Sequence, residues 1–88
     1  MKTFPLTKKE RNIIAEYIFS YHTGVLIKSD AISLIDVLVK YNIVERGLDF
    51  EKAINSNERG VTSSLILLLD KYIAEEQIEQ IMNEYYKG

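Results

Sequence analysis

The sequence predicts an all-α fold: a compact bundle of four to five short helices and no sheet. Apolar residues recur at intervals of three and four along most of the chain, as they do on one face of a helix. Several of these stretches begin at a capping residue or end at Gly or Asn, which are common helix boundaries. The one strand-like run, residues 25–27, has no convincing second strand to pair with. The expected helices span about residues 8–22, 30–41, 49–55, 62–72 and 75–87.

The first helix has the clearest start signal. Thr7 and Glu10 have the spacing of a capping box, in which each side chain accepts from the other residue's backbone amide. Pro5 disfavours helix in the residue before it, so residues 1–6 are expected to form a short tail. Gly24 is expected to end the helix with a positive φ. The apolar face of this helix consists of Ile13, Ile14, Tyr17, Ile18 and Tyr21.

The second helix is expected to be the central one. Ser29 or Asp30 can cap it, and Asn42 suits a left-handed residue at its end, with Ile43 folding back on the last turn. Its main apolar stripe consists of Ala31, Leu34, Ile35, Leu38 and Tyr41. Further apolar residues lie on its other sides, namely Ile32, Val37 and Val39. We therefore expect this helix to be nearly surrounded by the rest of the protein. A connector, a short helix over 49–55 and a polar loop over 55–60 are expected to follow it in the chain.

The C-terminal stretch, residues 61–88, carries two apolar stripes that would point in opposite directions on one straight helix. Either a single helix buries one face and then the other, or the chain bends near Ile73 and Ala74. The bend is favoured because Ile73 and Ile78 are spaced as a hydrophobic staple and two acids occupy the new first turn. Ala74 weakens this interpretation, since its side chain offers no acceptor for capping.

Length and composition indicate one domain, residues 1–88, with ordinary globular composition. The chain has no cysteine, which excludes disulfides and thiolate metal sites. No apolar run approaches the roughly 18 residues of a membrane span, and the N-terminus lacks the apolar core of a signal peptide. A cytoplasmic location is therefore expected.

The net charge of −2 is unevenly distributed. Residues 1–28 have a net charge of +3, and residues 61–88 have a net charge of −3. Solvated helix faces can differ in this way by chance. Alternatively, a basic and an acidic surface steer a partner protein or a second copy of the chain.

Residues that would support catalysis are scarce. The four glycines are scattered singly, so no phosphate-binding loop is present. His22 is the only histidine and is expected near a helix C-terminus, where free carbonyls and the dipole favour it. Asp36 and Asp70 interrupt apolar runs and are interpreted as polar helix edges, with a buried hydrogen-bonding role as the alternative. We therefore expect no enzymatic activity, no metal and no cofactor.

Six tyrosines in 88 residues favour a protein-interaction module, because tyrosine is enriched among the residues that dominate binding at protein interfaces. The competing interpretation is ordinary packing at the core margin, with a dry ring and a wet hydroxyl. The predicted partner-binding residues are Tyr72, Glu75, Ile78, Glu79, Met82, Tyr85 and Tyr86. We expect a small regulator or inhibitor that binds its partner stoichiometrically. A homodimer would explain the two opposed apolar faces of residues 61–88.

Two further functions stay open. A DNA-binding regulator of the helix–turn–helix type would use the basic cluster Lys8, Lys9 and Arg11, but the recognition helix would begin with acids that repel phosphates. In size and helix content the chain is similar to bacteriocin immunity proteins and to small bacterial or phage regulators that inhibit by binding. That similarity implies a partner protein and assigns no residue, because no motif carries it.

Overall fold

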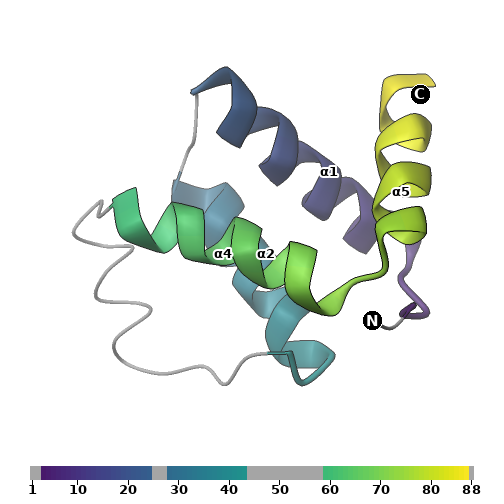
Figure 1. Cartoon of the computed structure of the whole chain (residues 1–88), viewed down its shortest axis with the longest axis horizontal. Coiled ribbons are helices and arrows are strands. Elements are labelled where there is room, and N and C mark those ends of the chain that lie inside the picture. The colour runs from purple at the N-terminus through teal and green to yellow at the C-terminus, as the bar shows by residue number, and fades with distance from the viewer. Residues whose placement is uncertain (1–2, 25–27, 44–58, 88) are drawn as a thin grey trace.

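The computed structural model describes residues 3–24, 28–43 and 59–87. The elements in this part of the chain are α1 (Lys8–Thr23), α2 (Lys28–Lys40), α4 (Arg59–Tyr72) and α5 (Glu75–Lys87) (Figure 1). All four are α-helices, which confirms the all-α prediction. The expected helix over 49–55, most of the expected loop over 55–60 and residues 25–27 lie outside the described residues.

The predicted boundaries of α1 are confirmed. The Thr7 hydroxyl accepts from the Glu10 amide at 3.1 Å, and the Glu10 carboxylate accepts from the Thr7 amide at 2.8 Å. At the other end Gly24 has a φ of 77°, and its amide donates to the carbonyls of Ser20 and Tyr21. Glycine adopts this left-handed conformation readily, because it has no Cβ to clash with the backbone.

The predicted end of α2 is confirmed in the same detail. Asn42 has a φ of 59°. Its amide donates to Val39 O at 3.0 Å, and the Ile43 amide donates to Leu38 O at 2.9 Å. These two bonds form a Schellman motif, which satisfies carbonyls that the helix itself leaves free. The helix starts at Lys28, two residues before the predicted start.

The bend in the C-terminal stretch is confirmed. The α4 helix ends at Tyr72 and α5 begins at Glu75, and the two axes diverge sharply in Figure 1. The Ala74 carbonyl accepts from the amides of Gln77 and Ile78 at 3.0 and 3.1 Å, so the new helix starts there without a side-chain cap. The α4 helix begins at Arg59, three residues earlier than predicted.

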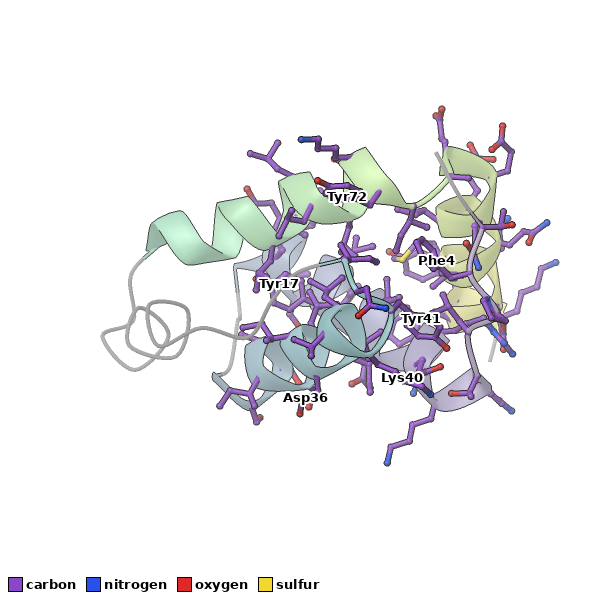
Figure 2. The ribbon with its side chains drawn as sticks, turned by 90° about the horizontal axis from the view of Figure 1, so that it is seen from below. Phe4, Tyr17, Asp36, Lys40, Tyr41 and Tyr72 are labelled. Atoms are coloured by element: carbon purple, nitrogen blue, oxygen red, sulfur yellow. The ribbon has the colours of Figure 1, made fainter. Side chains whose placement is uncertain are left out.

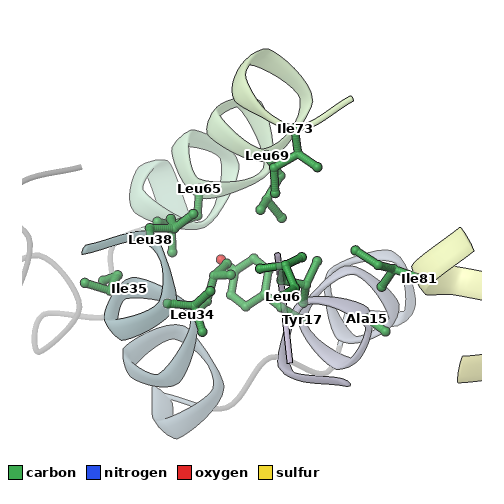
Figure 3. Packing of buried hydrophobic residues seen from close by; sticks show 12 residues of the cluster. Leu6, Ala15, Tyr17, Leu34, Ile35, Leu38, Leu65, Leu69, Ile73 and Ile81 are labelled. Carbon is green, nitrogen blue, oxygen red and sulfur yellow. The ribbon is translucent and has the colours of Figure 1, made fainter. Parts of the chain in front are cut away.

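The core draws side chains from all four helices and from Leu6, as Figure 3 shows. The fully buried large side chains are Ile14, Tyr17, Leu34, Leu38, Leu65, Leu69, Ile73 and Ile81. Burying one such side chain contributes about 1.5–3 kcal/mol.

Within the described residues α1, rather than α2 as predicted, makes the larger share of the contacts between helices. The α1 helix packs extensively against both α2 and α5. Ile32 of α2 is 42% exposed, so α2 is not surrounded. The bend explains the difference, because it lets α5 leave the line of α4 and cover a further side of α1. No helix within the described ranges is long and apolar enough to cross a membrane.

Candidate functional site

Four of the predicted partner-binding residues form one stripe along α5. Glu75, Glu79, Met82 and Tyr86 follow one another at intervals of four, three and four residues, which places them on a single side of the helix. Both glutamates and Tyr86 are exposed, whereas Met82 is partly buried and packs against the core cluster. We call this set the α5 stripe: it is acidic at its N-terminal end and apolar at its C-terminal end.

Two further predicted partner residues on α5 face the core. Ile78 and Tyr85 are partly buried and pack against the core cluster, beside the fully buried Ile81. Leu65 and Leu69 before the bend and Ile81 after it are buried within one molecule, whereas Tyr72 and Leu67 are exposed. The predicted homodimer stays a prediction for sedimentation or light scattering to test.

Three aromatic rings meet where the C-terminal end of α5 lies against α1. The Phe19 ring centroid lies 6.0 Å from that of Tyr85 and 6.4 Å from that of Tyr86, and the two tyrosine centroids are 5.8 Å apart. Phe19 is 39% exposed and Tyr86 is 65% exposed. We call these three residues the aromatic cluster; it adjoins the apolar end of the α5 stripe.

Sequence reasoning missed Phe19. Its signal was available, because Phe19 lies outside the stripe of apolar residues that α1 turns to the core. A large aromatic residue outside the core face of a helix is expected to pack against another side chain. The sequence alone does not tell which helix supplies that side chain.

Tyr72 stands apart from the other predicted partner residues. It belongs to the last turn of α4, on the other side of the bend, and its exposed ring lies 5.3 Å from Lys71 Nζ (Figure 2). It is 39% exposed. The structure thus groups the α5 residues with Phe19 and leaves Tyr72 outside that group.

The other end of α1 carries a buried carboxylate. Glu10 is 7% exposed, and its oxygens accept from Lys40 Nζ at 2.8 Å, from the Tyr41 hydroxyl at 2.6 Å and from the Thr7 amide. Burial alone would raise the pKa of the Glu10 carboxyl, but these hydrogen bonds outweigh it and lower the pKa to about 2. The carboxylate raises the pKa of Lys40 and of Tyr41 in turn. This network joins the start of α1 to the end of α2.

Residues 4–6, part of the expected tail, form hydrogen bonds with side chains of the helices. The Phe4 amide donates to Gln77 Oε1 at 2.9 Å, and Gln77 Nε2 donates to the Phe4 carbonyl at 2.7 Å. The Phe4 ring meets the Tyr41 ring edge-on at 5.7 Å, and Figure 2 shows the two side chains near one another. We call residues 4–6 the N-terminal arm.

The residues predicted for nucleic acid binding are divided. Lys8 and Lys9 are exposed in the first turn of α1. Arg11 is engaged within the molecule: its Nε lies 2.9 Å from Glu84 Oε2, and its Nη1 donates to the Leu6 carbonyl at 2.8 Å. The guanidinium lowers the pKa of Glu84. Two of the three predicted cations are therefore free to meet a phosphate.

The remaining candidates lie at the surface. Asp36 and Asp70 are exposed, as expected for polar helix edges. His22 is exposed in the last turn of α1, with its ring 5.6 Å from that of Tyr21. Among the described residues, no three His, Cys, Asp or Glu side chains are grouped so as to hold a metal ion.

Comparison with known proteins adds no family. No family model, no curated protein and no solved structure matches this chain. Its function is therefore inferred from the residues described above.

Proposed function

We propose that this protein acts as a small regulator or inhibitor that binds another protein stoichiometrically through the aromatic cluster and the α5 stripe. The observation that carries the proposal is the exposure of Phe19 and Tyr86, whose rings contact one another across two helices. Tyrosine and other aromatic residues are enriched among the residues that dominate binding energy at protein interfaces.

The rigidity of the surface supports this role. Tyr85 is partly buried against the core, and it holds its ring beside the two exposed rings. An aromatic side chain fixed in this way loses little conformational entropy when it binds, so more of the contact energy appears as affinity.

The charge of the α5 stripe indicates the chemistry of the partner. Glu75 and Glu79 are exposed one turn apart at the end of α5 that lies away from the aromatic cluster. A complementary surface would place an apolar group on the rings and basic residues opposite the glutamates. Such a combination speeds association and fixes orientation, while the apolar contact supplies most of the affinity.

The DNA-binding and immunity-type alternatives receive no comparable support. The helix–turn–helix would run through residues 44–58, which lie outside the described residues, and Arg11 is paired with Glu84. An immunity-type protein would be a special case of the same proposal, with a toxin as the partner.

The experiment is site-specific photo-crosslinking in cells, with a photoreactive phenylalanine at position 86. The matched control carries the same group at position 32, because Ile32 is also an exposed apolar residue but belongs to α2. We expect one predominant crosslinked protein from position 86 only, and its loss when Phe19→Ser is added. Titration calorimetry with that purified partner should give one site per chain.

Equal crosslinking from positions 86 and 32, or an unchanged product in the Phe19→Ser variant, would contradict the proposal. Salt-dependent retardation of DNA that disappears in a Lys8→Ala, Lys9→Ala variant would instead favour the DNA-binding alternative.

A further inference from the structure

The N-terminal arm is bound through its main chain by three different elements. The Phe4 carbonyl accepts from Gln77 Nε2 at 2.7 Å and from the Leu6 amide at 2.8 Å, and the Leu6 carbonyl accepts from Arg11 Nη1 at 2.8 Å. The Pro5 carbonyl lies 3.1 Å from the Tyr41 hydroxyl, whose single proton is shared with the nearer Glu10 carboxylate at 2.6 Å. Gln77 also accepts from the Phe4 amide, so a single glutamine makes both main-chain bonds that a neighbouring β-strand would make.

The side chains of the arm alternate between packed and exposed. Phe4 is partly buried beside the Tyr41 ring, and Leu6 is 9% exposed within the core cluster, whereas Pro5 between them is exposed. The Leu6 amide donates to the Phe4 carbonyl at 2.8 Å, so the arm makes a γ-turn at Pro5, with main-chain bonds to the helices on one side and two packed side chains on the other. Proline also restricts the free peptide, which lowers the entropy cost of binding.

Two of the donors are held in place by residues outside the arm. The Tyr41 hydroxyl lies 2.6 Å from the buried Glu10 carboxylate, and Arg11 Nε lies 2.9 Å from Glu84. Glu84 orients the Arg11 guanidinium, and Glu10 holds the Tyr41 ring in place, without help from the arm. The positions of both side chains are therefore set before a peptide binds.

We propose that Gln77, Tyr41 and Arg11 form a binding site for a peptide of the pattern aromatic–Pro–aliphatic, turned at its proline, which the chain's own residues 4–6 occupy in the free protein. This site goes beyond the proposed function, because Gln77 is two residues from Glu79 and so lies on roughly the opposite side of α5 from the α5 stripe. The tethered arm competes with any external peptide at an effective concentration of about 1 mM.

The test uses the full chain with Phe4→Ala, which weakens the arm and leaves the three donors in place. The probe is the blocked peptide acetyl-Thr-Phe-Pro-Leu-amide, followed by NMR of backbone amides in α5. We expect saturable shifts, with an apparent Kd about 10-fold or more below that of the unaltered chain, because the arm no longer occupies the site. Adding Gln77→Ala should abolish the shifts, whereas Gln80→Ala, an exposed position on the same helix, should leave them unchanged.

A folded Phe4→Ala chain that shows no saturable shift at about 10 mM peptide, well above the effective concentration of the tether, would overturn the proposal. Equal losses from Gln77→Ala and Gln80→Ala, or equal binding of a peptide with Ala in place of Phe, would also overturn it. If the Phe4→Ala chain does not fold, hydrogen exchange at the Phe4 amide of the unaltered chain decides. Exchange accelerated by the peptide supports displacement of the arm, and unchanged exchange at about 10 mM contradicts it.

Discussion

The two ends of α1 differ in how their side chains are used. At the N-terminal end the buried Glu10 carboxylate accepts hydrogen bonds from Lys40, Tyr41 and Thr7 of the same molecule. At the C-terminal end Phe19 and Tyr86 expose apolar rings that contact one another. Hydrogen-bonded buried polar groups stabilise a fold, whereas exposed apolar rings can contribute binding free energy when a partner protein buries them. Variants at the first end should therefore change stability, and variants at the second end should change binding.

The largest expected effect is that of Glu10→Gln. Removing the charge weakens the bonds from Lys40 and Tyr41 in a buried position, which should lower the free energy of unfolding by about 1.5–3 kcal/mol. Urea unfolding followed by circular dichroism measures this loss. Glu16→Gln is the matched control, because Glu16 is exposed on the same helix. Equal stability of the two variants would show that the buried network contributes nothing.

The same carboxylate predicts a loss of stability in acid. The folded-state pKa of Glu10 is about 2, below the ordinary value of 4.5. The stabilisation is therefore complete above about pH 4.5 and is lost as the pH falls toward 2. After allowance for the solvent exposure of Lys40, its size is on the order of 2 kcal/mol. Unfolding free energies measured between pH 6 and 2 should decline less steeply for Glu10→Gln than for the unaltered chain; parallel curves would contradict the assignment.

Gly24→Ala tests the left-handed backbone conformation of the residue that ends α1. A Cβ at this position meets nothing within 4 Å, so the cost comes from the φ of 77° alone. We expect a loss of about 1 kcal/mol, measured as a lower Tm. Gly24→Asn should lose less, because asparagine adopts left-handed conformations more readily. A neutral Gly24→Ala would mean that the residue leaves this conformation at little cost.

The Arg11–Glu84 pair should have a small effect, because both side chains are well exposed. A double-mutant cycle with Arg11→Met and Glu84→Gln should give a small favourable coupling energy that decreases at high salt. A coupling that high salt leaves intact would place the pair in a drier environment than the structure indicates.

The smallest effect on stability is expected for Tyr86→Ser, within about 0.5 kcal/mol, because Tyr86 is 65% exposed. The same variant should weaken binding of the partner that position 86 crosslinks. Unfolding curves and calorimetry on one preparation measure both quantities. A variant that loses stability by more than about 1 kcal/mol while keeping its affinity would reverse the contrast between the two ends of α1.

Local patterns predicted local structure well. Thr7 with Glu10, Gly24 and Asn42 with Ile43 each act through backbone groups within a few residues, so their spacing alone fixed the helix ends. The bend at Ile73 and Ala74 was also predictable, because the apolar stripe changes direction there.

The grouping of the site was only partly predictable. The spacing of Glu75, Glu79, Met82 and Tyr86 places them on one side of α5 from sequence alone. Phe19 joins them only because α5 turns back against α1, and Tyr72 is separated from them by the same turn. The sequence predicted the capping role of Glu10 but not its burial, which results from the packing of α2 against α1 and the contacts with Lys40 and Tyr41.

The sequence by itself determined that the chain is helical in its described parts, where α1 and α2 end and where the C-terminal stretch divides. Those features depend on steric preferences and hydrogen bonds between residues close in the chain. Tertiary structure decided that α1 packs against both α2 and α5, that Glu10 is buried and that residues 4–6 lie against Gln77. Those outcomes depend on contacts between residues up to 73 positions apart, which form only when the helices pack against one another.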